Sequence, residues 1–286
     1  MSDLGPVDPG HGADLAWLRR WRLHQDGDAV TTASSRLIPV STEDGTPAML
    51  KIAHVEEEAR GADLLVALEG HGAARVLRRD GRALLLERAM GDRDLVEMVR
   101  AGSDDEATRI VCSVAGRLHR QTGRVLGSAE PPDLVVLETW FRRLFEHADA
   151  LEPLHRAGAS LARRLLDEPG EPVVLHGDLH HANVLDFGEH GWLAIDPKGL
   201  VGDAEFDVCN LLCNPHDLAL APGRLARQFA VVVEATGFDE RRLRDWLVAW
   251  CALSSTWFAL DDDPERSAAV ARIGELAAGL DGGALA

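Results

Sequence analysis

The sequence predicts an α+β fold made of two lobes: a small β-rich N-terminal lobe, residues 1–88, and a larger, mainly helical C-terminal lobe, residues 89–286. The chain has 286 residues, which exceeds the roughly 100–200 residues of one typical domain. Short apolar runs bounded by turn residues, together with one helix, precede residue 88, whereas long helical patterns follow it. A cleft between two such lobes is where ligand sites commonly form.

The elements follow from these patterns in chain order. Strands are expected at Leu37–Val40 and Pro47–Ala53, and a helix is expected to begin within Val55–Arg60, where several acids suit the first turn. The lobes are expected to join near residues 88–91. Helical patterns in the C-terminal lobe cover Ala107–Gln121, Val135–Ala150 and Arg241–Leu260.

The segment VLHGDLHHANVL, Val174–Leu185, places polar residues in a loop between two short apolar runs. Asp178 and Asn183 are five residues apart, the separation found in the protein-kinase catalytic loop H-R-D-x-x-x-x-N, where Asp takes the hydroxyl proton and Asn holds a magnesium ion. Asp196 follows Asn183 by thirteen residues at the end of another apolar run, as the metal-binding Asp of the D-F-G element does. The spacing indicates phosphoryl transfer.

Two roles outside phosphoryl transfer also fit this segment. The first is structural: His176, His180 and His181 could be loop histidines that cap turns, and each Asp could cap a helix. The second is a zinc hydrolase, since three His and two Asp offer metal ligands. The sequence has no Cys-x-x-Cys and no His-x-x-x-His pair on an expected helix to support zinc.

The chain contains only two lysines, and both lie at positions of possible chemistry. Lys51 interrupts the apolar strand Pro47–Ala53, and Glu58 lies in the helix that follows, which is the kinase arrangement of a phosphate-binding Lys and its Glu partner. The alternative for Lys51 is an edge-strand residue that faces water. Lys198 lies two residues after Asp196 and could contact phosphate or substrate, or lie in a solvated turn.

The run HGDLHHANVL and the following segment Gly191–Leu212 resemble the aminoglycoside phosphotransferase superfamily, and within it the group of streptomycin 6-kinases and hydroxyurea phosphotransferases. The resemblance extends to four further stretches and covers roughly residues 30–275. These stretches are Asp44–Lys51, Glu58–Leu65, Leu84–Arg88 and Leu253–Asp263. The resemblance implies a bilobal, protein-kinase-like fold.

The resemblance also implies roles for individual residues. Asp178 would be the catalytic base, Asn183 and Asp196 would be the Mg²⁺ ligands, and Lys51 with Glu58 would hold the nucleotide. His176 and His180 would support the catalytic loop. Glu87, Arg88 and Ala89 would contact the nucleotide base at the hinge between the lobes. The cofactors implied are ATP or GTP and Mg²⁺.

The phosphate-covering loop is where this chain departs from kinase sequences. It has no G-x-G-x-x-G in its N-terminal half and no G-x-x-x-x-G-K-[ST], so a P-loop nucleotide fold is not expected. The turn at residues 31–36 lies in the corresponding place, and Ser34 and Ser35 are the candidates there for covering the phosphates.

The net charge is −17, from 47 acidic and 30 basic residues. A field of this sign disfavours nucleic acid and favours a cationic small molecule as partner. The candidate substrate carboxylates are Asp203 and Glu205, which with Asp207 follow the predicted metal strand, and the run Asp261, Asp262 and Asp263. A carboxylate cluster within reach of the catalytic loop could pair with guanidinium groups. The alternative for the run is a solvated turn and a helix cap before Pro264.

Several features favour a cytoplasmic protein. Four scattered cysteines are expected to be free thiols of a reducing compartment. The start of the chain lacks a basic and an apolar signal region, so export is not indicated. No window approaches 18 apolar residues, so no membrane span is expected. The expected state is a monomer or a weak homodimer.

The sequence thus predicts an ATP-dependent phosphotransferase that modifies a hydroxyl of an aminoglycoside, with streptomycin 6-phosphorylation, which confers antibiotic resistance, as the specific expectation. The alternative of the same class is a kinase of another hydroxylated small molecule, such as hydroxyurea or an endogenous metabolite. The alternative of another class is a nucleotide-binding pseudokinase without turnover. Retention of Lys51, Asp178, Asn183 and Asp196 together argues against the pseudokinase.

Overall fold

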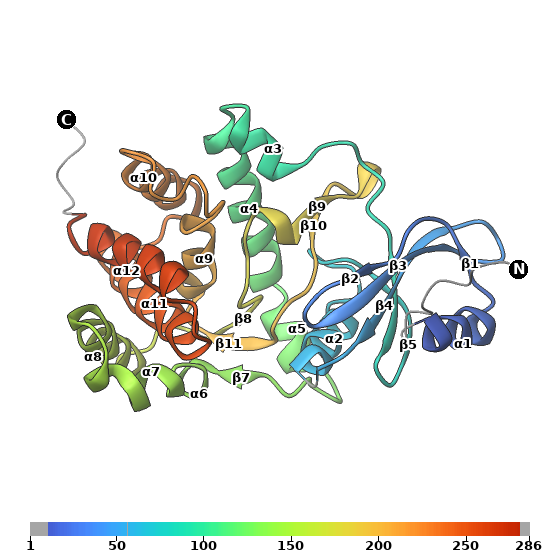
Figure 1. Ribbon diagram of the computed structural model, residues 1–286, viewed down its shortest axis with the longest axis horizontal. Helices are drawn as coiled ribbons and strands as arrows, with labels where there is room; N and C mark the ends of the chain where they lie inside the picture. Colours follow the sequence, from blue (N-terminus) through green and yellow to red (C-terminus); the bar gives the residue numbers. More distant parts are fainter. Residues whose placement is uncertain (1–10, 56, 281–286) are drawn as a thin grey trace, which may run out of the picture.

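The computed structural model describes residues 11–55 and 57–280 and has two lobes (Figure 1). The N-terminal lobe consists of a curved sheet with a helix on each side of it. Its elements are α1 (His11–Trp21), β1 (His24–Gln25), β2 (Val30–Thr31), β3 (Ser35–Ser41), β4 (Pro47–Ala53), α2 (Glu57–Leu68), β5 (Val76–Asp80) and β6 (Ala83–Glu87). The predicted strand around Lys51 is therefore β4, and Glu58 lies in the first turn of α2.

The N-terminal sheet is antiparallel, with strand order β1-β3-β4-β6-β5 and β2 paired with β3. Lys51 lies at its centre, opposite Leu37 on β3 and Leu84 on β6. Alternate residues of β6 serve the two faces of the sheet: Ala83 and Leu85 pack on the side of α1, and Leu84 and Leu86 on the side of α2. Burial on both faces explains why this strand is apolar without alternation.

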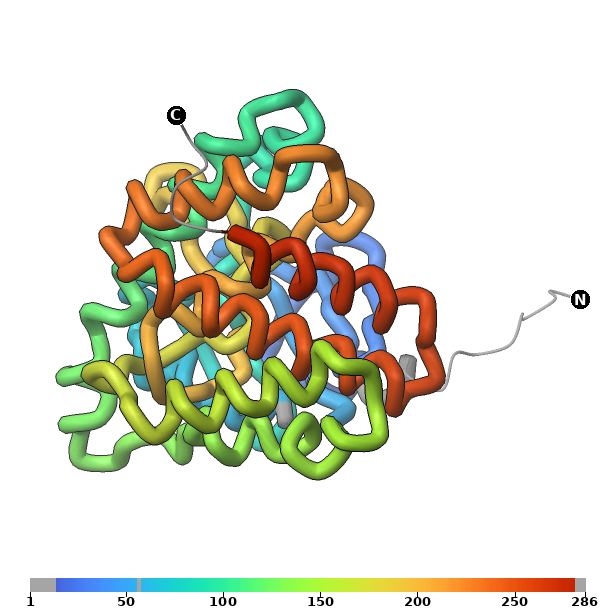
Figure 2. Tube along the Cα trace, turned by 90° about the vertical axis from the view of Figure 1, so that its left-hand side faces the viewer, coloured from blue at the N-terminus to red at the C-terminus, as the bar shows by residue number. Residues whose placement is uncertain are grey.

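The C-terminal lobe is mainly helical. Its helices are α3 (Leu95–Arg100), α4 (Asp104–His119), α5 (Thr122–Leu126), α6 (Leu137–Trp140), α7 (Arg142–His147), η1 (Ala148–Ala150), α8 (Pro153–Asp167), η2 (His181–Asn183), η3 (Gly188–His190), η4 (Ala204–Val208), α9 (Cys209–Leu212), α10 (Arg224–Thr236), α11 (Glu240–Leu260) and α12 (Pro264–Ala278). Figure 2 shows α8, α11 and α12 lying side by side, and α11 contacts both of the others. The buried α11 forms the centre of this layer.

Two small sheets lie between the helices and the N-terminal lobe. One is the antiparallel hairpin of β9 (Val184–Asp186) and β10 (Trp192–Ala194). The other places β11 (Leu200–Gly202) between β7 (Val135–Val136) and β8 (Val173–Leu175). The loops that leave β8 and β10 carry the predicted site.

The expected helices Ala107–Gln121 and Arg241–Leu260 correspond to α4 and α11. The prediction of one helix over Val135–Ala150 was wrong, because the segment is divided into β7, α6, α7 and η1. Val135 and Val136 pair with Leu200 and Val201 of β11, a contact with a distant segment that helical periodicity does not report.

The lobes are joined by more than the chain connection that follows Glu87. The amide of Ala74 donates to the carbonyl oxygen of Ala194, and the amide of Ala194 donates to that of Gly72. In the connection itself, the amide of Gly91 donates to the carbonyl oxygen of Asp186. One apolar core runs from α2 and β6 into the C-terminal helices. The N-terminal lobe therefore rests directly on the β9–β10 hairpin.

Candidate active site

The loop between β8 and β9 brings Asp178 and Asn183 together. The chain turns at Gly177, whose φ of 83° suits glycine. A short helical turn, η2, then returns Asn183 to the base of the loop. The side-chain amide of Asn183 donates to the backbone carbonyl oxygen of Asp178 at 2.8 Å, and its nitrogen lies 3.4 Å from Oδ2 of that carboxylate. The predicted base and the predicted metal ligand are thus neighbours.

Asp196 joins this pair from the end of β10. The amide of Ile195 donates to the carbonyl oxygen of Asn183 at 2.9 Å, which brings the following residue to the loop. Asp196 has a φ of 61°, a backbone conformation that is uncommon for residues other than glycine and that recurs at active sites. Its carboxylate forms an ion pair with Lys51 of the N-terminal lobe.

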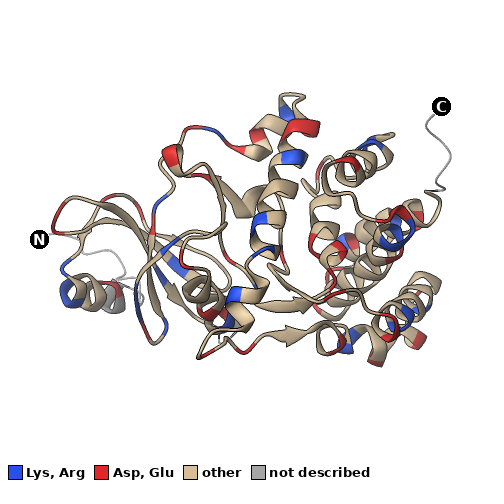
Figure 3. Ribbon diagram, turned by 180° about the vertical axis from the view of Figure 1, so that it is seen from behind, with Lys and Arg blue, Asp and Glu red and all other residues tan. Residues whose placement is uncertain are grey.

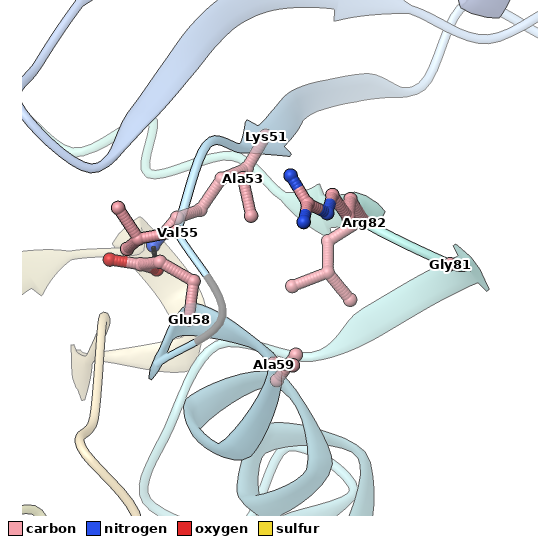
Figure 4. A pocket seen from close by; sticks show the side chains of 9 residues that line it. Lys51, Ala53, Val55, Glu58, Ala59, Gly81 and Arg82 are labelled. Atoms are coloured by element: carbon pink, nitrogen blue, oxygen red, sulfur yellow. Dashed lines mark ion pairs between the residues drawn. The ribbon is translucent and has the colours of Figure 1, made fainter.

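Lys51 is buried and pairs with two carboxylates, those of Glu58 and Asp196. The predicted Lys51–Glu58 ion pair is therefore present, and it joins α2 to β4 (Figure 4). Burial alone would raise the pKa of Asp196, but the charge and hydrogen bond of Lys51 outweigh it, and the pKa is lowered. Asp196 is consequently an anion at neutral pH.

Asp178 has the opposite shift. Burial raises the pKa of its carboxyl group, and this effect exceeds the opposing influence of His176 and Lys198. Two carboxyl groups whose environments move their pKa values apart are typical of sites where one group exchanges a proton and the other stays charged. Asp178 is the group suited to accept a proton, and Asp196 the group suited to hold a cation.

His176 and His180 make the supporting contacts expected of them. The Nε2 atom of His176 lies 2.7 Å from the carbonyl oxygen of Ile195, and its Nδ1 atom accepts from the amide of Asp178. His176 thus connects the two segments that carry the site. His180 caps η2, since its Nδ1 atom accepts from the amide of Ala182.

Asp207, one of the acidic residues that follow the predicted metal strand, is a supporting residue, a role that the sequence motifs did not reveal. Asp207 is 2% exposed, and its carboxylate accepts from the amides of His176 and Gly177 at 3.0 and 2.8 Å. The Nε2 atom of His119 lies 3.0 Å from Oδ2, the same oxygen that accepts from the amide of His176. The hydrogen bond and charge of His119 overcome the effect of burial and lower the pKa of Asp207. This carboxylate therefore holds the backbone of the loop just before Asp178.

Asn210 was not predicted either, and it contacts the predicted base directly. Its side-chain amide donates to Oδ1 of Asp178 at 2.7 Å. Asn214 in turn donates to Oδ1 and to the carbonyl oxygen of Asn210. A signal was present in the sequence: Asp207, Asn210 and Asn214 are the polar residues at helical spacing within an otherwise apolar run.

Ser34 and Ser35, the serines predicted to cover the nucleotide phosphates, lie in the turn between β2 and β3. Ser35 is buried, and its hydroxyl lies 3.2 Å from that of Thr32, so it stabilises its own turn. Ser34 lies in the same β2–β3 turn, and its carbonyl oxygen accepts from the amide of His54. The hydroxyl of Ser35 is therefore engaged within the protein.

Of the three hinge candidates, Glu87 and Arg88 have protein partners. The Glu87 carboxylate accepts from the amide of Arg75 and lies 3.2 Å from His190. Arg88 forms an ion pair with Asp26. Ala89 packs on a small apolar cluster at the junction of the lobes, which consists of Ala74, Leu185, Phe187, Leu193 and Ile195.

Lys198 lies at the site. Its amide donates to the carbonyl oxygen of His176, and its charge acts on Asp178, His180 and Asp196. Asp203 instead has a structural environment. It is buried, pairs with Arg242, and accepts from the indole of Trp246 and the amide of Gly170. A substrate contact by Asp203 is not consistent with this arrangement.

The expected carboxylates do not form one cluster. Glu205 lies beside Asp203, near Asp239 and Arg242 at the start of α11, whereas Asp261–Asp263 follow the end of this helix. Because α11 has 21 residues, its ends are about 30 Å apart. The side chain of Asp263 caps α12 by accepting from the amide of Arg266. The helix-cap alternative is therefore correct for Asp263, while Asp261 and Asp262 are exposed.

Acidic and basic residues are interspersed along the helices of both lobes in the view of Figure 3. Arg266, in the first turn of α12, acts on His216, and His216 acts on His180 of the catalytic loop.

A cavity of about 200 Å³ lies on the α2 side of Lys51 and Glu58 (Figure 4). Its walls are formed by β4, α2 and the β5–β6 turn, and Arg82 lies at its edge. The residues that line it are Lys51, Ala53, Val55, Glu58, Ala59, Ala62, Gly81, Arg82 and Leu84. Asp178, Asn183 and Asp196 do not line this cavity, which shares Lys51 and Glu58 with the predicted site.

The oxygen atoms at the site suit magnesium. Asp196 offers a carboxylate, and Asn183, whose amide nitrogen is committed to Asp178, retains its carbonyl oxygen. Mg²⁺ is usually bound through one or two protein oxygens together with substrate phosphates. Within residues 11–55 and 57–280, no group of three or more His, Cys, Asp or Glu side chains is placed to hold a metal ion by itself. In the same part of the chain no helix is long and apolar enough to cross a membrane.

Residues 20–262 match the family model of the aminoglycoside/hydroxyurea antibiotic resistance kinases. A streptomycin 3''-kinase of Klebsiella pneumoniae is 48% identical over 254 residues, which cover 85% of this chain and 91% of that protein. A streptomycin 6-kinase of Streptomyces griseus is 32% identical over 265 residues, 83% of this chain and 79% of that protein.

A solved structure of a thermostable mutant of the aminoglycoside phosphotransferase APH(4)-Ia, in ternary complex with ADP and hygromycin B, matches with a TM-score of 0.65. The match covers 95% of this chain and 99% of that one at 12% sequence identity. At this identity the likeness shows the fold, and it confirms the bilobal, kinase-like α+β architecture.

Proposed function

The chain belongs to the family of aminoglycoside/hydroxyurea antibiotic resistance kinases, and we propose that it transfers the γ-phosphoryl group of ATP to a hydroxyl of streptomycin. The observation that carries this proposal is the convergence of Lys51, Asp178, Asn183 and Asp196 from both lobes on one place. The 48% identity to a streptomycin 3''-kinase supports the substrate.

In the proposed reaction Asp178 accepts the proton of the substrate hydroxyl. The hydroxyl oxygen bonds to the γ-phosphorus, and the bond from this phosphorus to the bridging oxygen of ADP breaks. Because little covalent chemistry falls to the protein in phosphoryl transfer, its contribution is positioning and stabilisation of charge. The raised pKa of Asp178 suits a group that gains a proton during the reaction.

Lys51 would contact the nucleotide phosphates. Its ammonium group is held between Glu58 and Asp196, so its position does not depend on a flexible side chain alone. Asn183 and Asp196 would hold Mg²⁺. When bound, Mg²⁺ supplies positive charge that neutralises the phosphate oxygens. The apolar cluster beside Ala89 offers a surface for the nucleotide base at the junction of the lobes.

The position of the accepting hydroxyl is the finer part of the proposal. The resemblance of the sequence motifs to streptomycin 6-kinases predicted that the 6-hydroxyl of streptomycin is the acceptor. The relative of 48% identity is a streptomycin 3''-kinase, whereas the 6-kinase of Streptomyces griseus is 32% identical. We therefore favour the 3''-hydroxyl, and 6-phosphorylation remains the alternative.

Phosphorus NMR of the reaction products tests this proposal. The purified protein is incubated with Mg²⁺ and either ATP or GTP, and each reaction contains one candidate acceptor: streptomycin, another aminoglycoside or hydroxyurea. We expect one phosphomonoester signal from streptomycin, coupled to the proton of the 3''-carbon, and its absence with the Asp178→Asn variant. If hydroxyurea is phosphorylated and no aminoglycoside is, the protein is a hydroxyurea kinase instead. Nucleotide binding without any product would favour the pseudokinase.

A further inference from the structure

Asn210 lies directly behind the carboxylate of Asp178 and is 8% exposed. It belongs to α9, which follows η4, the short helix that carries Asp207. Since Asp207 and Asn210 are three residues apart on a helical path, both side chains face the catalytic loop. Asp207 holds the backbone before the base, and Asn210 contacts the base itself.

The hydrogen bond from Asn210 to Asp178 is short and directional. Nδ2 of Asn210 lies 2.7 Å from Oδ1 of the carboxylate. An ionised carboxylate can only accept, so the amide must present its nitrogen to Asp178. The other carboxylate oxygen lies 3.4 Å from the nitrogen of Asn183. Of the two amides, Asn210 therefore makes the closer contact and limits rotation of the carboxylate most.

Asn214 determines which end of the Asn210 amide faces the base. Its own amide nitrogen donates to Oδ1 of Asn210 at 2.8 Å and to the backbone oxygen of Asn210 at 3.0 Å. With Oδ1 engaged on that side, only the nitrogen of Asn210 remains to face Asp178. Arg224 donates to the carbonyl oxygen of Asn214 at 2.9 Å and is itself held by both carboxylate oxygens of Asp104.

We propose that Asn210 is a positioning residue for phosphoryl transfer: it fixes the rotation of the Asp178 carboxylate, and Asn214 fixes the orientation of the Asn210 amide. The proposal rests on the proposed function of Asp178 as the base. A base acts only when its free lone pair meets the hydroxyl proton within hydrogen-bond reach, so a rotated carboxylate loses rate without losing bound substrate.

The test variant is Asn210→Leu, which keeps the branched shape and removes the donor. We expect kcat to fall about 10- to 100-fold, as for loss of a hydrogen bond to a charged group, with KM for ATP and streptomycin nearly unchanged. Thr108→Val is the matched control, since Thr108 makes a buried hydrogen bond of 2.7 Å to Gln228 between α4 and α10. The control should retain kcat.

A double-mutant cycle distinguishes positioning from a general structural effect. In the Asp178→Ala background Asn210 has no carboxylate to orient, so Asn210→Leu should leave the residual rate unchanged. An equal fractional loss in both backgrounds, or a wild-type kcat for the single variant, would overturn the proposal.

Asn214→Leu provides a second variant if Asn210→Leu does not fold. It should lower kcat less than Asn210→Leu, again only when Asp178 is present, and an effect without Asp178 would contradict the proposal. If the wild type fails to phosphorylate streptomycin, the proposed function fails. The rates of ATP hydrolysis, with water as the acceptor, are then measured for the same four proteins. A loss on Asn210→Leu only when Asp178 is present supports the role of Asn210, and an equal fractional loss in both backgrounds contradicts it.

Discussion

The carbonyl oxygen of Pro197 lies 2.0 Å from the position that a β-carbon on Gly61 would occupy. Gly61 belongs to α2, three residues after Glu58, and Pro197 follows Asp196. The absence of a side chain at Gly61 therefore lets the helix with Glu58 approach the segment with Asp196 closely enough for Lys51 to pair with both carboxylates.

Gly61→Ala should consequently displace α2 and weaken the ion pairs of Lys51. We expect a higher KM for ATP and a fall in kcat/KM that can reach about 10²-fold, the cost of a displacement of roughly 1 Å at a catalytic group. Gly123→Ala is the matched control, because Gly123 is also helical and a β-carbon there would meet nothing within 4 Å. Wild-type kinetics for Gly61→Ala would show that the close packing has no catalytic role.

Asp178→Asn should abolish most turnover and leave nucleotide binding nearly intact. The variant keeps an oxygen that can accept from Asn210 but cannot take the hydroxyl proton, so we expect a loss of about 10²–10⁴-fold in kcat. Calorimetry with ATP and a steady-state assay on the same preparation measure the two quantities. An unimpaired rate would exclude Asp178 as the base.

Lys51→Ala and Glu58→Gln should each lower kcat/KM, and the double variant should lose no more than Lys51→Ala does. Glu58 acts by holding Lys51, so its removal has no further effect once Lys51 is absent. Asp63→Asn is the control from the same helix, since Asp63 pairs with the partly exposed Arg79. Additive losses would mean that Glu58 has a separate role.

Asp263→Ala should reduce stability and leave KM for streptomycin unchanged. Loss of the cap of α12 should lower the free energy of unfolding by about 1 kcal/mol. The double variant Asp261→Asn with Asp262→Asn should have the reverse pattern if these residues attract the cationic substrate: similar stability, a higher KM, and a weaker dependence of KM on salt. Chemical denaturation measures the free energy of unfolding of each variant, and initial rates at two salt concentrations measure its KM for streptomycin.

His155 should make stability depend on pH. It is buried beneath α11 and bonded to Ser255, and burial lowers the pKa of its imidazole. The unfolded chain therefore binds a proton near pH 6.5 that the folded chain does not bind, and stability falls as the pH decreases below this value. We expect the stability difference between wild type and His155→Gln to decrease from pH 7.5 to 5.5. A constant difference would show that His155 does not titrate differently on folding.

Local patterns along the chain were enough to predict the parts of the site that lie close together in sequence. Asp178 and Asn183 belong to one loop, and Lys51 and Glu58 lie on a strand and the helix that follows it. Such patterns depend on strand ends, turns and periodicity, which neighbouring residues set. The predictions of the loop, of β4 and of the Lys51–Glu58 ion pair are confirmed for this reason.

Contacts between distant segments follow from the packing of the folded chain, and no local pattern predicts them. Asn210 reaches Asp178 across 32 residues of chain, and Gly61 meets Pro197 across the two lobes. The acidic residues expected in one cluster are divided between the two ends of α11, because a helix of 21 residues holds them about 30 Å apart. Charge and composition describe what side chains can do, but packing of helices and loops decides which of them meet.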